Sequence, residues 1–186
     1  MKNLTPMRVL FAFLICLVSA QSQAALLLEP LVGYSVGKLN GEYDPGTADF
    51  DESLKGTSYG GRVGYQNLGF QLGLDYLASN MEADDMDFKT SEFGGFVGFE
   101  FPVLVRVYAG YVFSGTGDLE QDIGGDLNLK GGTGPKIGVG FTLLPFLDVN
   151  LEYRRISYDE KDLGLGVTLD ADYSATMLSF SLPFTL

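Results

Sequence analysis

The charged residues that could do chemistry in this chain do not form a compact motif. They recur singly, and apolar residues flank most of them. Carboxylates and basic side chains that meet where water is scarce form ion pairs, because an unpaired buried charge is costly. The residues that we expect to meet in this way are Glu29, Arg62, Asp75, Glu92, Glu100, Arg106, Lys136, Asp148, Glu152 and Arg154.

The composition contains few of the residues that commonly act in catalysis. The sequence contains no histidine, and its one cysteine is Cys16. Ser35, Ser174 and Ser179 could act as nucleophiles only beside a general base, and no such partner stands out near them. We therefore expect a protein that is not an enzyme and that needs no cofactor.

Another set of acidic residues is a weak candidate for metal binding. Asp84, Asp85 and Asp87 offer the oxygen ligands that Ca²⁺ and Mg²⁺ prefer, but their spacing does not match an EF-hand loop. A solvated acidic segment is the simpler interpretation, so we assign no metal site. The formal net charge of −12 also argues against a basic surface for nucleic acid.

An alternating pattern surrounds these charges and is clearest in residues 91–114. One parity carries large apolar side chains, and the other carries glycine, charged residues and a few apolar ones. Successive residues of a strand point to opposite faces, so the segment predicts two antiparallel strands with Pro102 between them. The large apolar residues are Phe93, Val97, Phe99, Phe101, Val105, Val107, Ala109, Tyr111 and Phe113.

Two features indicate that the large apolar face points outward. Glycine would weaken a solvated strand face without a gain, whereas inside a narrow barrel it makes room for long charged side chains. The apolar residues are also too bulky to fill a barrel of about eight strands, which barely holds its own side chains. A soluble periplasmic lipid-binding barrel would need the opposite orientation, and the glycine content argues against it.

The first 24 residues have the three parts of a secretory signal peptide. Lys2 and Arg8 flank the start, an apolar run follows over 9–18, and small polar residues lead to cleavage expected after Ala24. The apolar run is too short for a transmembrane helix. We therefore expect a leader over 1–24 and one domain over 25–186.

Eight strands are predicted in the domain, joined by connections of alternating length. Three tight turns fall near 67, 102 and 145, and four long loops fall at 39–57, 78–91, 115–131 and 159–172. This alternation of short and long connections fits an all-β fold, an eight-stranded antiparallel up-and-down transmembrane β-barrel with short periplasmic turns. The predicted strands are 26–38, 58–65, 70–77, 91–101, 104–114, 133–143, 147–158 and 173–186.

With these features, the chain resembles the small eight-stranded outer-membrane barrels of the OmpA and OmpX type, without a peptidoglycan-binding domain. The resemblance implies a bacterial outer-membrane location, contact with outer-membrane lipid and lipopolysaccharide, and assembly by the barrel-assembly machinery. Members usually end in an aromatic residue, whereas this chain ends in Leu186. We expect a monomer with no nucleic-acid partner.

The ten charged residues are then expected to line the lumen as a salt-bridge network. Counting outward from Pro102 places Glu100 and Arg106 at nearly the same height on adjacent strands, so we predict an ion pair between them. The predicted role is structural or interactive: envelope integrity, adhesion, or lipopolysaccharide contact through acidic outer loops. The alternative is a narrow pore for ions or small hydrophobic molecules, for which Pro135 beside Gly132 and Gly134 hints at a broken strand wall.

Overall fold

The computed structural model describes residues 25–44, 49–83, 86–121, 127–144, 146–164 and 167–186. The leader predicted over 1–24 lies outside the described residues. Ten strand segments account for most of the described chain. They are β1 (Ala25–Asp44), β2 (Asp49–Asn67), β3 (Phe70–Ala83), β4 (Met86–Phe101), β5 (Val105–Gln121), β6 (Leu127–Leu129), β7 (Gly134–Leu144), β8 (Leu147–Gly164), β9 (Val167–Ser181) and β10 (Phe184–Thr185).

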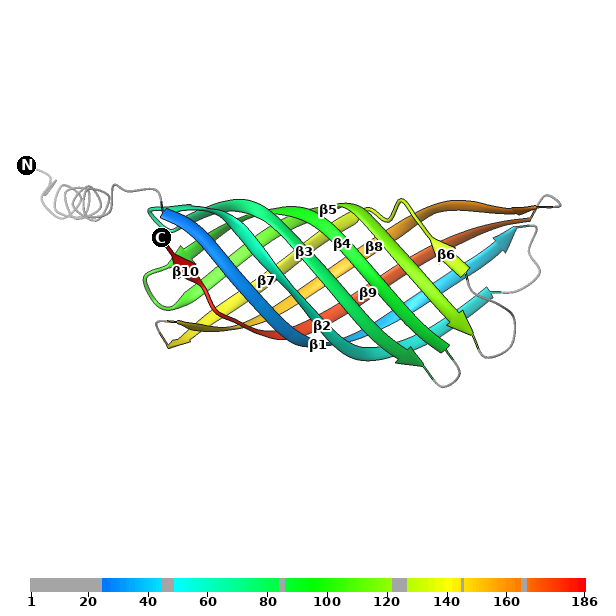
Figure 1. The fold of residues 1–186 in the computed structure, drawn as a ribbon, viewed down its shortest axis with the longest axis horizontal. Coiled ribbons are helices and arrows are strands. Elements are labelled where there is room, and N and C mark those ends of the chain that lie inside the picture. The colour runs from blue at the N-terminus through cyan, green and yellow to red at the C-terminus, as the bar shows by residue number, and fades with distance from the viewer. Residues whose placement is uncertain (1–24, 45–48, 84–85, 122–126, 145, 165–166) are drawn as a thin grey trace, which may run out of the picture.

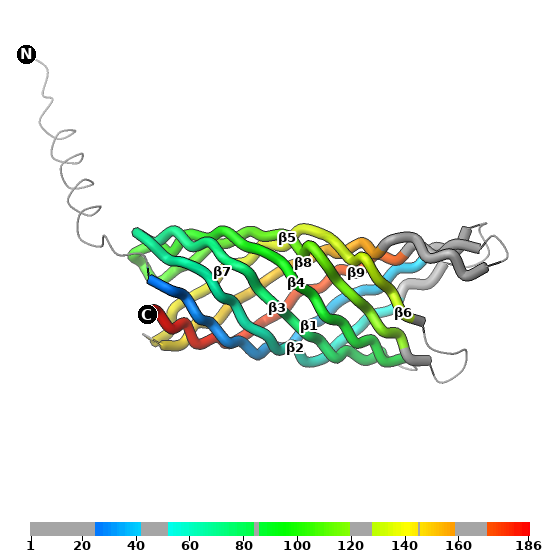
Figure 2. The backbone as a smooth tube through the Cα atoms, turned by 45° about the horizontal axis from the view of Figure 1, so that its top comes forward, coloured from blue at the N-terminus to red at the C-terminus, as the bar shows by residue number. Residues whose placement is uncertain are grey.

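These segments form one closed antiparallel barrel, as Figures 1 and 2 show. Each main strand pairs with the next along the chain, and β9 returns to pair with β1 from Leu31↔Ser181 to Asp44↔Thr168. The segment β10 extends the β9 side and pairs with β1 near its start, while β6 and β7 both pair with β5. The wall therefore has eight strands, which confirms the predicted fold. Among the described residues, no helix is long and apolar enough to cross a membrane.

Both described chain ends lie at one end of the barrel, which we call the terminus end (Figure 1). The backbone groups of Leu26 and Leu186 exchange hydrogen bonds of 2.9 and 3.0 Å there. The β2–β3 turn lies at this end and has positive φ at Leu68 (52°) and Gly69 (84°), as a tight two-residue hairpin requires. Residues 102–104 form the second tight turn, which confirms the place predicted for Pro102.

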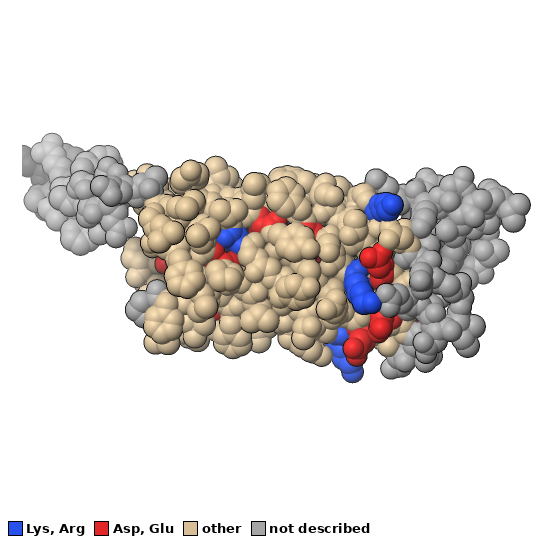
Figure 3. Space-filling view, viewed as in Figure 1, with Lys and Arg blue, Asp and Glu red and all other residues tan. Residues whose placement is uncertain are grey.

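The outward direction of the large apolar side chains is confirmed. Val97 is 56% exposed and Phe70 is 67% exposed, whereas inward residues such as Arg106 are buried. Figure 3 shows the consequence, a middle zone of the wall made mostly of uncharged residues. In a water-soluble protein this surface would be a severe liability, but facing hydrocarbon it is favourable.

The strands are much longer than the sequence suggested. The predicted loops at 39–57 and 78–91 are mostly strand, because β1 and β2 pair as far as Glu42↔Asp49 and β3 and β4 as far as Ala83↔Met86. The loops predicted at 115–131 and 159–172 are likewise largely taken up by β5, β6, β8 and β9. The four long loops were therefore a wrong prediction, and the barrel wall continues well beyond the apolar zone.

We expected a polar, charged lumen, but the interior is not polar throughout. The half of the lumen far from the terminus end, which we call the far end, holds an apolar cluster of buried side chains. Phe88 and Tyr173 meet edge to face in it, with ring centroids 5.5 Å apart. Its other buried members are Leu39, Leu54, Met81, Val112, Leu119, Leu129, Ile156, Tyr158, Ala171 and Ala175.

Large apolar residues thus change faces along most of the long strands. In β1, Tyr34 and Val36 point outward and Leu39 points inward; in β8, Tyr153 points outward and Ile156 inward. In β5 a bulge helps to produce the change, since the register shifts by one residue opposite Phe93/Gly94. At the far end, the barrel therefore has its large apolar residues inside, as a water-soluble protein does.

One stretch of the wall is interrupted. The β5–β7 ladder ends at Val112↔Gly134, and farther out β5 pairs with β6 instead. Between β6 and β7 the chain turns at Gly131 (φ 72°), and Gly132 donates a hydrogen bond from N to the Gly115 carbonyl at 2.9 Å. The interruption lies where glycine and Pro135 had hinted at a broken wall.

Candidate functional site

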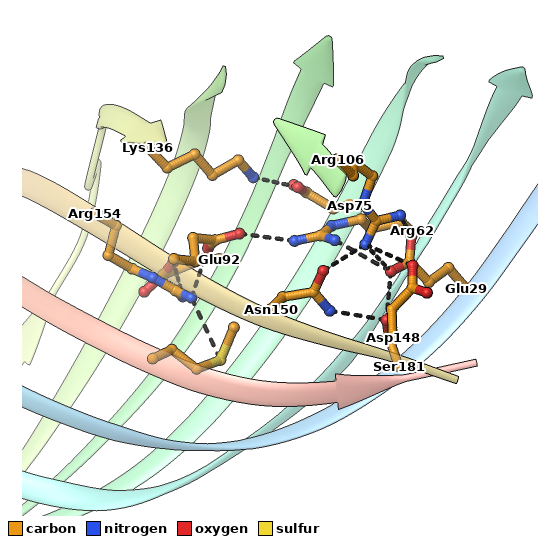
Figure 4. A network of polar contacts seen from close by, with 12 residues as sticks. Glu29, Arg62, Asp75, Glu92, Arg106, Lys136, Asp148, Asn150, Arg154 and Ser181 are labelled. Atoms are coloured by element: carbon orange, nitrogen blue, oxygen red, sulfur yellow. Dashed lines mark hydrogen bonds and ion pairs between the residues drawn. The ribbon is translucent and has the colours of Figure 1, made fainter. Parts of the chain in front are cut away.

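All ten charged residues proposed for the lumen point into it, and they come from seven different strands. Eight of them are buried, while Asp75 and Glu100 are partly buried. Strand alternation explains the shared direction, because each residue falls on the parity that faces the barrel axis. Figure 4 shows most of them converging inside the barrel.

Glu29 is the hub of this network. Its carboxylate accepts hydrogen bonds from both terminal nitrogens of Arg106, at 2.8 and 2.6 Å, and from Arg62 at 3.3 Å. Ser181 Oγ donates a further hydrogen bond to it at 2.6 Å. Glu29 therefore ties β1 to β2, β5 and β9 through one buried group. A carboxylate held by a forked guanidinium makes one of the strongest neutralising contacts available to a protein.

A second carboxylate continues the chain of charges. Arg62 Nη2 donates to Glu152 at 2.8 Å, and Arg154 donates to the other oxygen of Glu152 at 2.7 Å. Arg154 also reaches Glu92 at 2.9 Å. Opposite charges thus alternate without a break from Arg106 to Glu92. This order lets every buried guanidinium lie between carboxylates, which offsets the cost of removing its charge from water.

The predicted ion pair between Glu100 and Arg106 is wrong. The two residues are register partners, as we had counted, but their side chains diverge. Arg106 crosses the lumen to Glu29 and lies 3.6 Å from Asp148, whereas Glu100 accepts hydrogen bonds from Gln66 at 2.9 Å and Gln71 at 3.4 Å. A guanidinium is long enough to leave its neighbour, and Glu29 offers it two oxygens in a drier place.

Lys136 and Asp75 form a separate ion pair on the side of the lumen that includes β3 and β7. Among the described residues, no hydrogen bond or ion pair joins this pair to the Glu29 network, and Figure 4 shows it beside the main chain of charges. The ammonium group is compact, so it serves one carboxylate here where the arginines serve two. The network therefore has one branched part and one isolated pair.

Several uncharged residues that we had not assigned complete the network. Asn150 accepts from Arg106 at 2.6 Å and donates to Ser181 at 2.9 Å. The Tyr108 ring lies 4.2 Å from the Arg62 guanidinium carbon and 5.6 Å from that of Arg106. The sequence shows that both residues fall on the inward parity. The hydrogen bonds of the Asn150 amide and the stacking of the Tyr108 ring, however, depend on neighbours that only the fold brings together.

Above the network the lumen changes character. Ser35, Ser58 and Ser79 form a row of buried hydroxyls with O···O distances of 2.7 and 2.8 Å. Beyond them the apolar cluster fills the far end of the lumen. The far half of the lumen is therefore mainly apolar, whereas the half near the terminus end holds the charged network together with buried apolar residues such as Leu27 and Phe96.

The metal candidates receive little support. Asp84 and Asp85 lie outside the described residues, and Asp87 is exposed. In the described parts of the chain, no group of three or more His, Cys, Asp or Glu side chains could hold a metal ion.

A charged pair lies on the outer surface, beyond the apolar zone. Asp172 accepts hydrogen bonds from Ser157 at 2.5 Å and from Arg155 at 3.0 Å. The hydrogen bond from the Ser157 hydroxyl, and to a smaller extent the Arg155 guanidinium, lower the pKa of the Asp172 carboxyl below its usual range. This contact joins β8 and β9 on the solvent side of the wall.

Comparison with known proteins places the chain in a family. The model of the outer membrane protein beta-barrel domain matches residues 9–184. Among solved structures, Neisserial surface protein A is 18% identical with a TM-score of 0.55, and the match covers 88% of this chain and 100% of that one. Ail of Yersinia pestis, solved with the heparin analogue sucrose octasulfate, is 15% identical with a TM-score of 0.57, covering 86% and 99%.

No curated protein matches the sequence. At these identities the structural matches speak for the fold alone. The family match covers most of the chain, however, and agrees with a closed barrel whose outer wall is apolar. The chain therefore belongs to the outer membrane protein beta-barrel domain family and is a protein of the bacterial outer membrane.

Proposed function

We propose that this protein is a closed, non-enzymatic barrel with a structural and interaction role in the outer membrane. The observation that supports this role is the filled lumen. The Glu29 network occupies the half near the terminus end, and the cluster around Phe88 and Tyr173 occupies the far end. An eight-stranded barrel has little interior space beyond its own side chains, so ions have no wide path.

The far end is the part that meets other molecules. In outer-membrane barrels the tight turns and both chain ends face the periplasm, so the far end faces the cell exterior. The long paired strands extend there, and acidic residues such as Glu82 and Asp118 are exposed on them. Envelope integrity, adhesion and contact with lipopolysaccharide are roles that such a rigid, charged wall can serve. We further propose a monomer that the barrel-assembly machinery inserts.

Conductance in a planar bilayer tests the closed lumen. We expect the refolded mature protein to give no unitary conductance steps under conditions in which a porin measured in parallel conducts. The double variant Phe88→Ala/Tyr173→Ala removes the largest rings of the cluster and is expected to admit water at the far end without opening the Glu29 network. Stable conductance steps from the unchanged protein would refute the proposal.

A narrow path for small hydrophobic molecules is the second candidate, and the interrupted wall favours it. The break between β6 and β7 lies against the buried Tyr158, whose ring would collide with any side chain added at Gly132. Replacing this ring should uncover a lateral opening. We would compare uptake of a small hydrophobic dye by cells that carry the unchanged protein or Tyr158→Ala. Equal uptake, with equal amounts of folded barrel, would exclude the lateral path.

A further inference from the structure

The outward-facing cations among the described side chains of this barrel lie at one level. Among residues whose side chains the structure describes, each exposed Lys or Arg lies beyond the apolar zone toward the far end, and the other four basic residues are inside the lumen. Figure 3 shows Lys and Arg together with Asp and Glu in a band across the molecule at that level. We call this set the outer basic belt: Lys38, Lys55, Lys89, Lys130 and Arg155.

The belt marks the polar edge of one leaflet only. Along β1 the outward residues run Val32, Tyr34, Val36 and then Lys38, so the apolar face gives way directly to a cation. Tyrosine at such a boundary is typical of the membrane interface. At the terminus end the described outward residues include no Lys or Arg. The chain is strongly acidic, and the outward-facing positive charges that the structure describes therefore lie only at the level of the outer leaflet.

A groove in the outer surface holds two of these cations. It has a volume of about 960 Å³ and lies over β1 and β2, with β9 and Tyr153 of β8 along one side. Lys38 is the register partner of Ser53, and Lys55 that of Val36, so the two lysines are diagonal neighbours on the same face. Such neighbours lie roughly 7–8 Å apart across a strand pair, close enough to hold one phosphorylated headgroup between them.

The groove combines apolar and basic side chains. Val36, Tyr153 and Lys55 lie in one cross-strand row of the wall, and Lys38 follows Val36 on the outward face of β1, two residues farther toward the far end. Small side chains such as Ser53 and Ser174 leave it hollow where larger residues would fill it. An acyl chain lying along the apolar wall would thus bring its phosphate to the two ammonium groups.

We propose that this groove is a binding site for the phosphorylated headgroup of an outer-leaflet glycolipid, the lipid A part of lipopolysaccharide. The proposal deepens the interaction role above and rests on it for the orientation of the barrel. It assigns that contact to Lys38 and Lys55 rather than to acidic loops. Glu82, the register partner of Lys55, also lines the groove, so Mg²⁺ is expected to strengthen binding by bridging its carboxylate to phosphate.

Native mass spectrometry of the mature barrel with lipid A tests the site. The variant Lys38→Gln/Lys55→Gln removes both ammonium groups, and Lys89→Gln/Lys130→Gln makes the same change in charge elsewhere in the belt. We expect the first variant to lose about tenfold in lipid A retention, as loss of charge-assisted hydrogen bonds implies, and the second to stay within about twofold of the unchanged protein. The variant Lys38→Arg/Lys55→Arg should retain binding.

Further arms identify the source of the phosphate. Fully dephosphorylated lipid A and phosphatidylglycerol should both bind less than lipid A, and inorganic phosphate should compete only weakly. Equal loss in both glutamine variants, no loss in either, or equal retention of phosphatidylglycerol would overturn the site. Preferential binding of sucrose octasulfate over lipid A would do so too, by pointing to a sulfated polysaccharide. The heat-induced mobility shift on gels checks that each variant is folded, and conductance reports separately on the closed lumen.

Discussion

Replacing Glu29 by glutamine should destabilise the barrel strongly. The change keeps the shape of the side chain but removes the charge that neutralises Arg106, at 2.6 and 2.8 Å, and Arg62, at 3.3 Å. Breaking a buried pair by neutralising one partner costs about 3–5 kcal/mol, because the other charge stays buried without compensation. Since Glu29 serves two arginines, we expect Glu29→Gln to fall toward the upper end of this range.

The matched control is Glu100→Gln, the same substitution on the same face of the wall. Glu100 is partly buried and accepts hydrogen bonds from Gln66 and Gln71, so its loss should cost about 1 kcal/mol. The double variant Glu29→Gln/Arg106→Gln should cost less than the sum of its single changes, because it removes both members of one pair.

Urea unfolding in phosphatidylcholine vesicles, followed by the mobility of folded protein on unboiled gels, gives the free energy of unfolding for each variant. Additivity in the double variant, or a cost of Glu29→Gln no greater than that of Glu100→Gln, would refute the view that Glu29 is the hub. Equal m-values across the series are needed for the comparison, since a changed slope would indicate a changed denatured state.

Two further predictions concern the wall. Gly138→Ala would place a methyl group against the Tyr108 ring, which is fixed over Arg62, and should cost about 1–3 kcal/mol in the same unfolding assay. Because the folded pKa of Asp172 is lowered by Ser157 and Arg155, its stabilising contribution is present above the unfolded pKa and is lost as pH falls through the folded one. The variant Asp172→Asn should therefore lose part of the acid dependence of stability.

Each of these has its own control. Gly61→Ala adds a methyl group on the outward face, where the nearest atom is 3.4 Å away, and should change stability by less than about 0.5 kcal/mol. If Gly138→Ala were equally harmless, the ring of Tyr108 would not be fixed. For Asp172, an unchanged slope of stability against pH between the two proteins in the acid range would contradict the assigned contact.

The membrane-facing half of the barrel could be predicted from the sequence because a period of two is a local property. The direction of Val97, the turn at Pro102 and the register of Glu100 with Arg106 all follow from counting along neighbouring residues. The partner of Arg106 could not be found in this way. Glu29 is distant in sequence and reaches Arg106 only across the closed lumen, so closure of the barrel decides that contact.

The outer half was misjudged for a different reason. Acidic residues such as Glu82 and Asp118 suggested loops, but on strands that stand in water an outward carboxylate is no obstacle. The inward residues between them, such as Met81 and Leu119, carried the signal that was missed. A single inside-out rule for the whole strand hid it, since the rule reverses where hydrocarbon gives way to water.

The point along a strand where the apolar residues change from the outward to the inward face marks the level of the bilayer surface. A strand needs only about 9–11 residues to cross a bilayer, and β1 has 20, so roughly half of it stands clear of the membrane. The bilayer surface lies near the point where Val36 faces out and Leu39 faces in. One residue inserted between them would turn every side chain beyond it to the opposite face, exposing Leu39 to water. Length is therefore far less free to vary here than in the surface loops through which such barrels commonly diversify.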